Sequence, residues 1–141
     1  MAMFLLKTEP SEYSFSDLVR EKRCVWSGVS NPGALIALRA IRMGDEIFVY
    51  HTGNERAIVG LAKAASNPYE DPGRPGTTDE GKPKFAVVDL SPGKPAKSPV
   101  TLAKIKADTR FATFGLVKQS RLSAMPVPEA LAKVLREWMG L

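Results

Sequence analysis

The stretch at residues 25–32 carries residue types that could hold a nucleobase. Trp26 is a large aromatic residue that stands close to Gly28. Asn31 is a favoured N-cap residue, and Pro32 suits the first helical position, where a missing N–H costs nothing. The free N–H groups at the start of a helix favour an anion. The stretch therefore offers a surface on which a base can stack, next to a place for its phosphate.

Three further residue types could take part in chemistry. His51 is the single histidine of the chain. A lone histidine at a strand end is more often a hydrogen-bonded structural residue than a catalyst, and no neighbouring histidine or cysteine completes a metal set. Tyr50 either stacks on a base or packs in the core, and core packing is favoured for Phe48. From its position, Glu9 is expected to be a solvated loop carboxylate. These residues predict no metal and no cofactor.

Charge is spread unevenly along the chain. The formal net charge is +5, and from Gly81 to Met125 nine basic side chains stand against two acids. This bias favours a polyanionic partner, although many small proteins show it without binding nucleic acid. The single cysteine permits no internal disulfide and favours a cytoplasmic setting. No apolar run approaches the roughly 20 residues of a membrane span, and the N-terminus does not resemble a signal peptide.

The strands that would position these residues follow from apolar alternation. The first is expected at 4–7. The segment 45–52 is apolar on both faces, which predicts a central strand, and a short turn should pair it with 57–65 as an antiparallel hairpin. Further strand material is expected at 84–90 and around 119–123.

The helices are expected at four places. Ser14 should begin the first, and the second, from Asn31 to Met43, is apolar nearly all round, which predicts extensive burial. Thr101 should cap a short third helix. The fourth opens with Pro128, and its spacing predicts a buried stripe of Leu131, Val134, Leu135 and Trp138.

Two connections are rich in proline and glycine. Residues 66–81 are expected to lack regular structure and to form a lid or a mobile segment. Residues 91–99 are expected to be a second irregular connection. The whole pattern predicts one α+β domain over residues 1–141, built around a small mixed β-barrel flanked by helices.

Four phrases, in their order and spacing, resemble the EVE domain of the PUA-like superfamily. They are Phe-Leu-Leu-Lys-Thr-Glu-Pro at 4–10, Trp-Ser-Gly-Val-Ser-Asn at 26–31, Gly-Asp-Glu-Ile-Phe-Val-Tyr-His-Thr at 44–52 and Arg-Leu-Ser-Ala-Met-Pro-Val at 121–127. The resemblance implies a nucleic-acid-binding module that reads a modified base, a modified cytosine especially, in DNA or RNA. The residues that it implies around the pocket are Lys7, Glu9, Pro10, Trp26, Val29, Asn31, Tyr50, His51, Arg121, Leu122 and Ser123.

The chain departs from the family phrase at two positions. Family members commonly carry arginine before the asparagine and an aromatic residue after it, where this chain has Ser30 and Pro32. Arg39, Arg56 and Arg121 are the candidates for supplying the missing charge.

Two alternatives to a base reader stay open. Related PUA-like folds include amidohydrolases of modified nucleosides that use a lysine, a threonine and a glutamate, and Lys7, Thr8 and Glu9 offer these types. Successive strand residues point to opposite faces, however, which is poor geometry for a nucleophile and its base. The third hypothesis is an accessory protein of RNA modification, or a partner of the toxin–antitoxin type, with a vestigial pocket.

Overall fold

Strand β3 (Glu46–His51) lies inside the sheet because both of its faces are apolar and buried. In the computed structural model, which describes residues 2–141, β3 pairs in parallel with β1 (Met3–Thr8) and antiparallel with β4 (Ala57–Ala64). The sheet runs β2-β6-β4-β3-β1-β7, and β5 pairs with β6 away from this path. The remaining strands are β2 (Cys24–Trp26), β5 (Tyr69–Glu70), β6 (Ala86–Thr101) and β7 (Ala124–Pro126).

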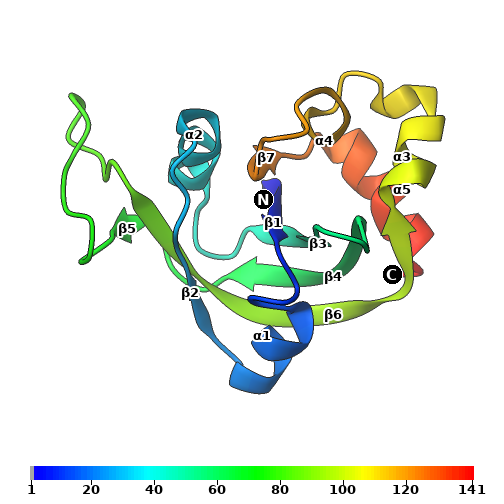
Figure 1. Cartoon of the computed structure of the whole chain (residues 1–141), viewed down its shortest axis with the longest axis horizontal. Coiled ribbons are helices and arrows are strands. Elements are labelled where there is room, and N and C mark those ends of the chain that lie inside the picture. The colour runs from blue at the N-terminus through cyan, green and yellow to red at the C-terminus, as the bar shows by residue number, and fades with distance from the viewer. Residues whose placement is uncertain (1) are drawn as a thin grey trace.

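The sheet curls into a half-barrel with helices on both sides (Figure 1). Alternate residues of β3 enter two separate cores, as the two-residue period of a strand requires. Ile47 and Val49 join a core that also holds side chains of α1 (Phe15–Glu21) and α2 (Pro32–Ala40). Phe48 and Tyr50 join a second core, which the C-terminal helices cover. The predicted mixed barrel flanked by helices is confirmed, in an open form.

The second core is covered by α3 (Leu102–Ala107), the 3-10 helix η1 (Thr109–Phe111), α4 (Gly115–Lys118) and α5 (Glu129–Met139). The predicted caps are confirmed. Ser14 and Asp17 form a capping box, and the side chains of Asn31 and Thr101 each accept an N–H of the helix that follows. Within residues 2–141, no helix has the length and apolar character that crossing a membrane requires.

Strand β6 corrects the prediction of an irregular connection at 91–99, because it continues without a break from Ala86 to Thr101. Pro92 and Pro95 lie opposite β4 where the register shifts twice, and such irregular positions tolerate a residue without an N–H. Gly93 allows the strands to approach closely, since a Cβ there would lie 2.8 Å from the carbonyl oxygen of Leu61.

Three further predictions about elements are wrong in part. Helix α2 ends at Ala40 rather than Met43, and Ile36 is 64% exposed, so only one face of this helix is buried. Residues 119–123 form a turn, and strand β7 begins only at Ala124. In α5 the fully buried positions are Ala132, Leu135 and Met139, while Leu131, Val134 and Trp138 pack at the border of the second core.

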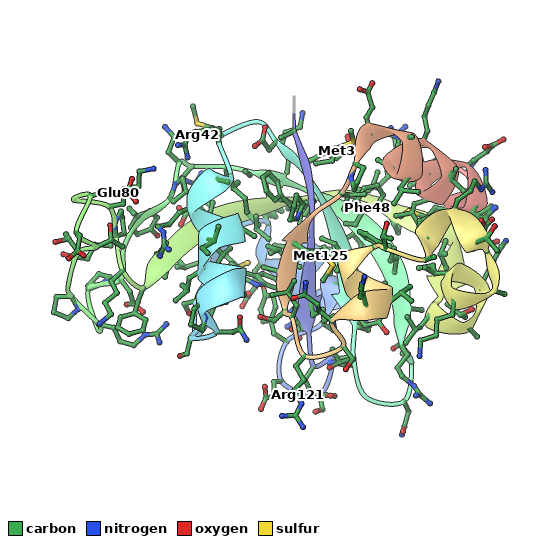
Figure 2. All side chains as sticks on the ribbon, turned by 90° about the horizontal axis from the view of Figure 1, so that it is seen from above. Met3, Arg42, Phe48, Glu80, Arg121 and Met125 are labelled. Atoms are coloured by element: carbon green, nitrogen blue, oxygen red, sulfur yellow. The ribbon has the colours of Figure 1, made fainter. Side chains whose placement is uncertain are left out.

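Residues 66–84, called the arm below, include the segment 66–81 and are more regular there than predicted. Strand β5 pairs with the start of β6, and an isolated bridge joins Thr77 to Pro83. The arm therefore folds back on itself. It projects beyond the sheet on the β5 side, and Glu80 lies near its outer end (Figures 1 and 2).

Candidate nucleic-acid interface

The end of β1, the start of α2 and the turn before β7 lie at one end of the molecule. Figure 2 shows Arg121 at the end opposite Met3 and Arg42. Strand β1 starts at Met3 and therefore runs toward Arg121. Helix α2 stops two residues before Arg42, so its N-terminus points the same way. The fold thus gathers most of the residues that the sequence had singled out.

Lys7 joins β1 to the turn at 119–123. Its main-chain N–H donates to the carbonyl oxygen of Ser123 at 2.9 Å, and its ammonium donates to that of Ser120, also at 2.9 Å. The ammonium also lies 5.7 Å from the ring centroid of Tyr50. Burial lowers the pKa of Lys7. A half-buried cation therefore lies between the end of β1 and the turn at 119–123.

Two hollows lie beside the end of β1. The cationic hollow has a volume of about 460 Å³ and is lined by Asn31, Gly33, Lys118, Gln119, Ser120, Arg121 and Leu122. The tryptophan hollow has a volume of about 280 Å³ and is lined by Thr8, Glu12, Tyr13, Cys24, Val25, Trp26 and Ser27. Within residues 2–141, no ion pair is recorded for Lys118 or Arg121, so both cations stay available to an anion.

Trp26 is a core residue that exposes only a small part of its side chain to the tryptophan hollow. The residue is 8% exposed and belongs to the first core, and its ring meets that of Tyr13 edge-on at 6.3 Å between centroids. It is therefore not the open platform that the sequence suggested. A base would reach this ring only through the tryptophan hollow.

Tyr50 and Phe48 are core residues. Tyr50 is 3% exposed and Phe48 is fully buried, and both pack in the second core. Burial raises the pKa of the Tyr50 hydroxyl. Since Lys7 already lies over its ring, Tyr50 does not present a free face to a base. The core interpretation therefore holds for both residues.

His51 is a hydrogen-bonded structural residue, as its position at a strand end predicted. Its Nε2 accepts the main-chain N–H of Phe15 at 3.0 Å, which leaves Nδ1 to donate to the Glu55 carboxylate at 3.2 Å. Phe15 is the first residue of α1, where a helix has N–H groups without an internal partner. His51 thus supports a helix start rather than a ligand.

Glu9 is engaged by its neighbours rather than freely solvated. Its carboxylate accepts from the N–H and hydroxyl of Ser11 and from the hydroxyl of Thr52. The hydrogen bond from the Ser11 backbone is the main cause that lowers the pKa of Glu9. Gly53 makes room for this contact, because a Cβ there would lie 2.9 Å from Glu9 Oε2. Pro10 begins the turn that follows.

The segment before α2 is held by an arginine that the sequence analysis missed. Arg74, in the arm, donates from Nη2 to the carbonyl oxygen of Val29 at 3.0 Å and from Nη1 to Ser30 Oγ at 2.9 Å. Of the candidates named for the missing charge, Arg121 lines the cationic hollow together with Asn31. Arg39 instead donates to the carbonyl oxygens of residues 83 and 84, and Arg56 lies beside Leu102, whose N–H its carbonyl oxygen accepts. No signal near Ser30 could have revealed a partner 44 residues away.

The turn at 119–123 meets α2 through Leu122. A Cβ added at Gly33 would lie 3.2 Å from Leu122 Cδ1, so glycine permits the close approach. Ser123 takes part through its main chain, by accepting the N–H of Lys7. Among residues 2–141, no cluster of three histidine, cysteine or acidic side chains offers a metal site.

Residues 2–138 match the family model described as EVE domain. The chain is 29% identical over 158 residues to human thymocyte nuclear protein 1, an alignment that covers 89% of this chain and 68% of the relative. It is 38% identical to Rpa0253 from Rhodopseudomonas palustris, with a TM-score of 0.88 and coverage of 99% and 94% of the two chains. Human THYN1, solved in complex with DNA that contains 5-methylcytosine, is 26% identical, with a TM-score of 0.85 and 98% coverage of both chains.

Proposed function

Because the chain belongs to the EVE domain family, we propose that it is a nucleic-acid-binding module that recognises a modified nucleobase, a modified cytosine in particular. The observation that carries this proposal is its likeness, over nearly its whole length, to human THYN1 in complex with DNA containing 5-methylcytosine. We also propose that residues 1–141 act as one such domain in the cytoplasm.

The chemistry at the end of β1 supports this function. Lys118 and Arg121 suit contacts to phosphate, which fix a strand in place without reading its sequence. The base itself needs an enclosed, largely apolar place once it has left its stack. The tryptophan hollow supplies Trp26 and Tyr13 as aromatic walls for such a base.

The polar groups that we propose to contact the edge of that base lie near the end of β1, outside the lining of the tryptophan hollow. Cytosine presents an amine donor, which a carboxylate or carbonyl oxygen accepts. We propose Glu9 for this contact, with Lys7 and Asn31 as further polar contacts near the end of β1. For the remaining residues that the family resemblance implies, we propose a contribution by shape. Leu122 lines the cationic hollow, and the others, Pro10, Val29, Tyr50, His51 and Ser123, support the two hollows from the segments around them.

The amidohydrolase hypothesis gains no support from the geometry. Thr8 Oγ1 donates to the carbonyl oxygen of Tyr13 at 2.7 Å, while Lys7 bonds Ser120 and Glu9 bonds Ser11 and Thr52. Each of the three side chains therefore has its own partner, and no nucleophile is held against a base. A binding role accounts for the arrangement better.

The test is a panel of oligonucleotides of one sequence that differ in a single base. Cytosine, 5-methylcytosine and other modified cytosines are compared in single-stranded DNA, duplex DNA and RNA at a fixed salt concentration, because salt changes affinity strongly. We expect at least one modified base to bind about tenfold more tightly than cytosine. This factor is at the lower end of the discrimination that one added methyl group gives in an apolar pocket. Equal affinity for every base in all three backbones would contradict the proposal.

A further inference from the structure

The segment from Ser27 to Asn31 connects β2 to α2 without regular structure of its own. Gly28 has a φ of +82°, and a Cβ placed there would meet nothing within 4 Å. Within residues 2–141, the hydrogen bonds recorded for Val29 and Ser30 both come from Arg74. The conformation of this segment therefore depends on a side chain of the arm.

Arg74 is itself fixed from several sides. Its guanidinium lies 4.4 Å from the ring centroid of Phe85, and its Nε donates to the Asp71 carboxylate at 3.4 Å. With Nη1 on Ser30 and Nη2 on Val29, the planar group is held by a ring, a carboxylate and two oxygen atoms. An arginine suits this place because its donors form a rigid fork, which a lysine does not offer.

The arm gives Arg74 a firm support. The N–H of Asp71 donates to the carbonyl oxygen of Phe85, and that of Gly76 donates to the Glu70 carboxylate at 3.0 Å. From the other side, Arg39 of α2 donates to the carbonyl oxygen of Lys84 at 3.1 Å. Two arginines thus connect the arm to α2 and to the segment that precedes it.

The anchored segment leads directly into the candidate site. Asn31 follows Ser30, caps α2 through Ala34 and lines the cationic hollow, while Ser27 and Trp26 line the tryptophan hollow. A segment that borders both hollows must keep its shape if the walls are to fit one base and not another. Preorganisation of this kind lowers the cost of binding.

We propose that the arm is part of the base-reading site, and that Arg74 is the positioning residue through which it sets the shape of Val29–Asn31. This inference rests on the proposed function. Arg74 does not act as a phosphate contact, because its donors serve protein oxygens and the Asp71 carboxylate offsets its charge. The arm therefore determines how strongly a modified base is preferred, rather than how strongly the backbone is held.

The test compares Arg74→Ala, Arg74→Lys and the control Arg42→Ala. Arg42 also donates twice to main-chain carbonyl oxygens, but it lies at the end opposite Arg121 (Figure 2). For each folded variant, the affinities for oligonucleotides with cytosine and with 5-methylcytosine are measured over a range of salt. Hydrogen exchange of the amides at residues 28–31 is followed in parallel.

We expect Arg74→Ala and Arg74→Lys to lower the preference for the modified base by about fivefold to tenfold, as the loss of charge-assisted hydrogen bonds predicts. Exchange at residues 28–31 should become faster, and Arg42→Ala should change neither property. The inference would be overturned if Arg74→Ala weakened binding equally for both bases and lowered the salt dependence, while Arg74→Lys restored binding. That result would show that Arg74 contacts a phosphate. An unchanged preference in Arg74→Ala would overturn the inference as well. A parent protein without any preference would instead refute the proposed function, and unchanged exchange in Arg74→Ala would then refute the anchoring separately.

Discussion

The ammonium of Lys7 donates to the main-chain carbonyl oxygen of Ser120 across 113 positions of sequence. This contact, together with the bond from the Lys7 N–H to Ser123, places the turn at 119–123 over the end of β1. The turn carries Arg121 and lines the cationic hollow with Lys118. The position of these cations therefore depends on a lysine in the first strand.

Replacing Lys7 with methionine tests that dependence. Methionine keeps an apolar stem above Tyr50 but donates no hydrogen bond. We expect Lys7→Met to change the free energy of unfolding by no more than about 1 kcal/mol, because the lost hydrogen bond is offset by relief from burying a charge. Binding to nucleic acid should weaken more than stability does, which calorimetric unfolding and fluorescence anisotropy can compare. Parental affinity in Lys7→Met would show that the turn holds its place without this contact.

Lys118 and Arg121 are predicted to hold the backbone and not the base. Replacing either with glutamine should lower the slope of log affinity against log salt by about 0.7 on single strands, the value for one phosphate. The preference for a modified base should not change, because phosphate contacts position a strand while base contacts specify it. Arg42→Gln is the control, since Arg42 lies at the opposite end (Figure 2). A changed preference with an unchanged slope would place these residues against the base instead.

Trp26 is predicted to serve both the core and the site. Trp26→Ala should cost about 3–5 kcal/mol of stability because it empties a core position. Trp26→Phe is the more informative change, since it keeps an aromatic ring and widens the tryptophan hollow. We expect this variant to remain folded and to lose part of its preference for the modified base. Trp138→Phe, the same change at the border of the second core, is the matched control. If Trp26→Phe folds and keeps the parental preference for the modified base, Trp26 contributes to core packing and not to base selection.

The pair of Tyr69 and Asp89 predicts a defined dependence of stability on pH. The Tyr69 hydroxyl donates to Asp89 Oδ1 at 2.6 Å, which raises the pKa of Tyr69 to about 12 and lowers that of Asp89. Asp89 contributes stability that is present above the ordinary aspartate pKa of 3.8 and is lost as pH falls below it. Tyr69 contributes stability that is present below the ordinary tyrosine pKa of 10.0 and is lost as pH rises toward about 12.

The variant Tyr69→Phe tests this pair. At neutral pH it should be less stable than the parent by about 1 kcal/mol, a typical value for one hydrogen bond. The difference should shrink in acid and in strong alkali, which chemical denaturation at a series of pH values can follow. A difference that stays constant from acid to alkali would mean that the lost ring contacts, and not the hydrogen bond, account for the effect.

Local chemistry explains what the sequence could predict. The caps at Ser14, Asn31 and Thr101 depend on residues three positions apart, and the central place of β3 follows from its own apolar faces. The same local rules failed at β6, where prolines normally indicate an irregular chain. There β4 supplies a partner with a shifted register, which no short window of sequence can show.

The sequence could indicate which residues lie near the candidate site, but not the contacts that hold them there. Trp26 lines the tryptophan hollow, and Asn31 and Arg121 line the cationic hollow, and their contact with a base stays a prediction. Arg74 was missed because its partners lie far away in the sequence, and proline and glycine around it suggested only mobility. The burial of Tyr50 was undecided and that of Trp26 was not expected, since an aromatic residue that stacks and one that packs look alike in a sequence.

The place of β1 between β3 and β7 has a consequence for the order of folding. Residues 4–6 of β1 pair with residues 124–126 of β7, so the first and last strands of the sheet are neighbours. Contacts between residues so far apart must overcome the entropy of closing a long loop, which slows folding in proteins rich in such contacts. The half-barrel can assemble its middle strands from local hairpins first. We therefore expect the end that carries Lys7, Ser120 and Arg121, where the candidate site lies, to form after the hairpin of β3 and β4.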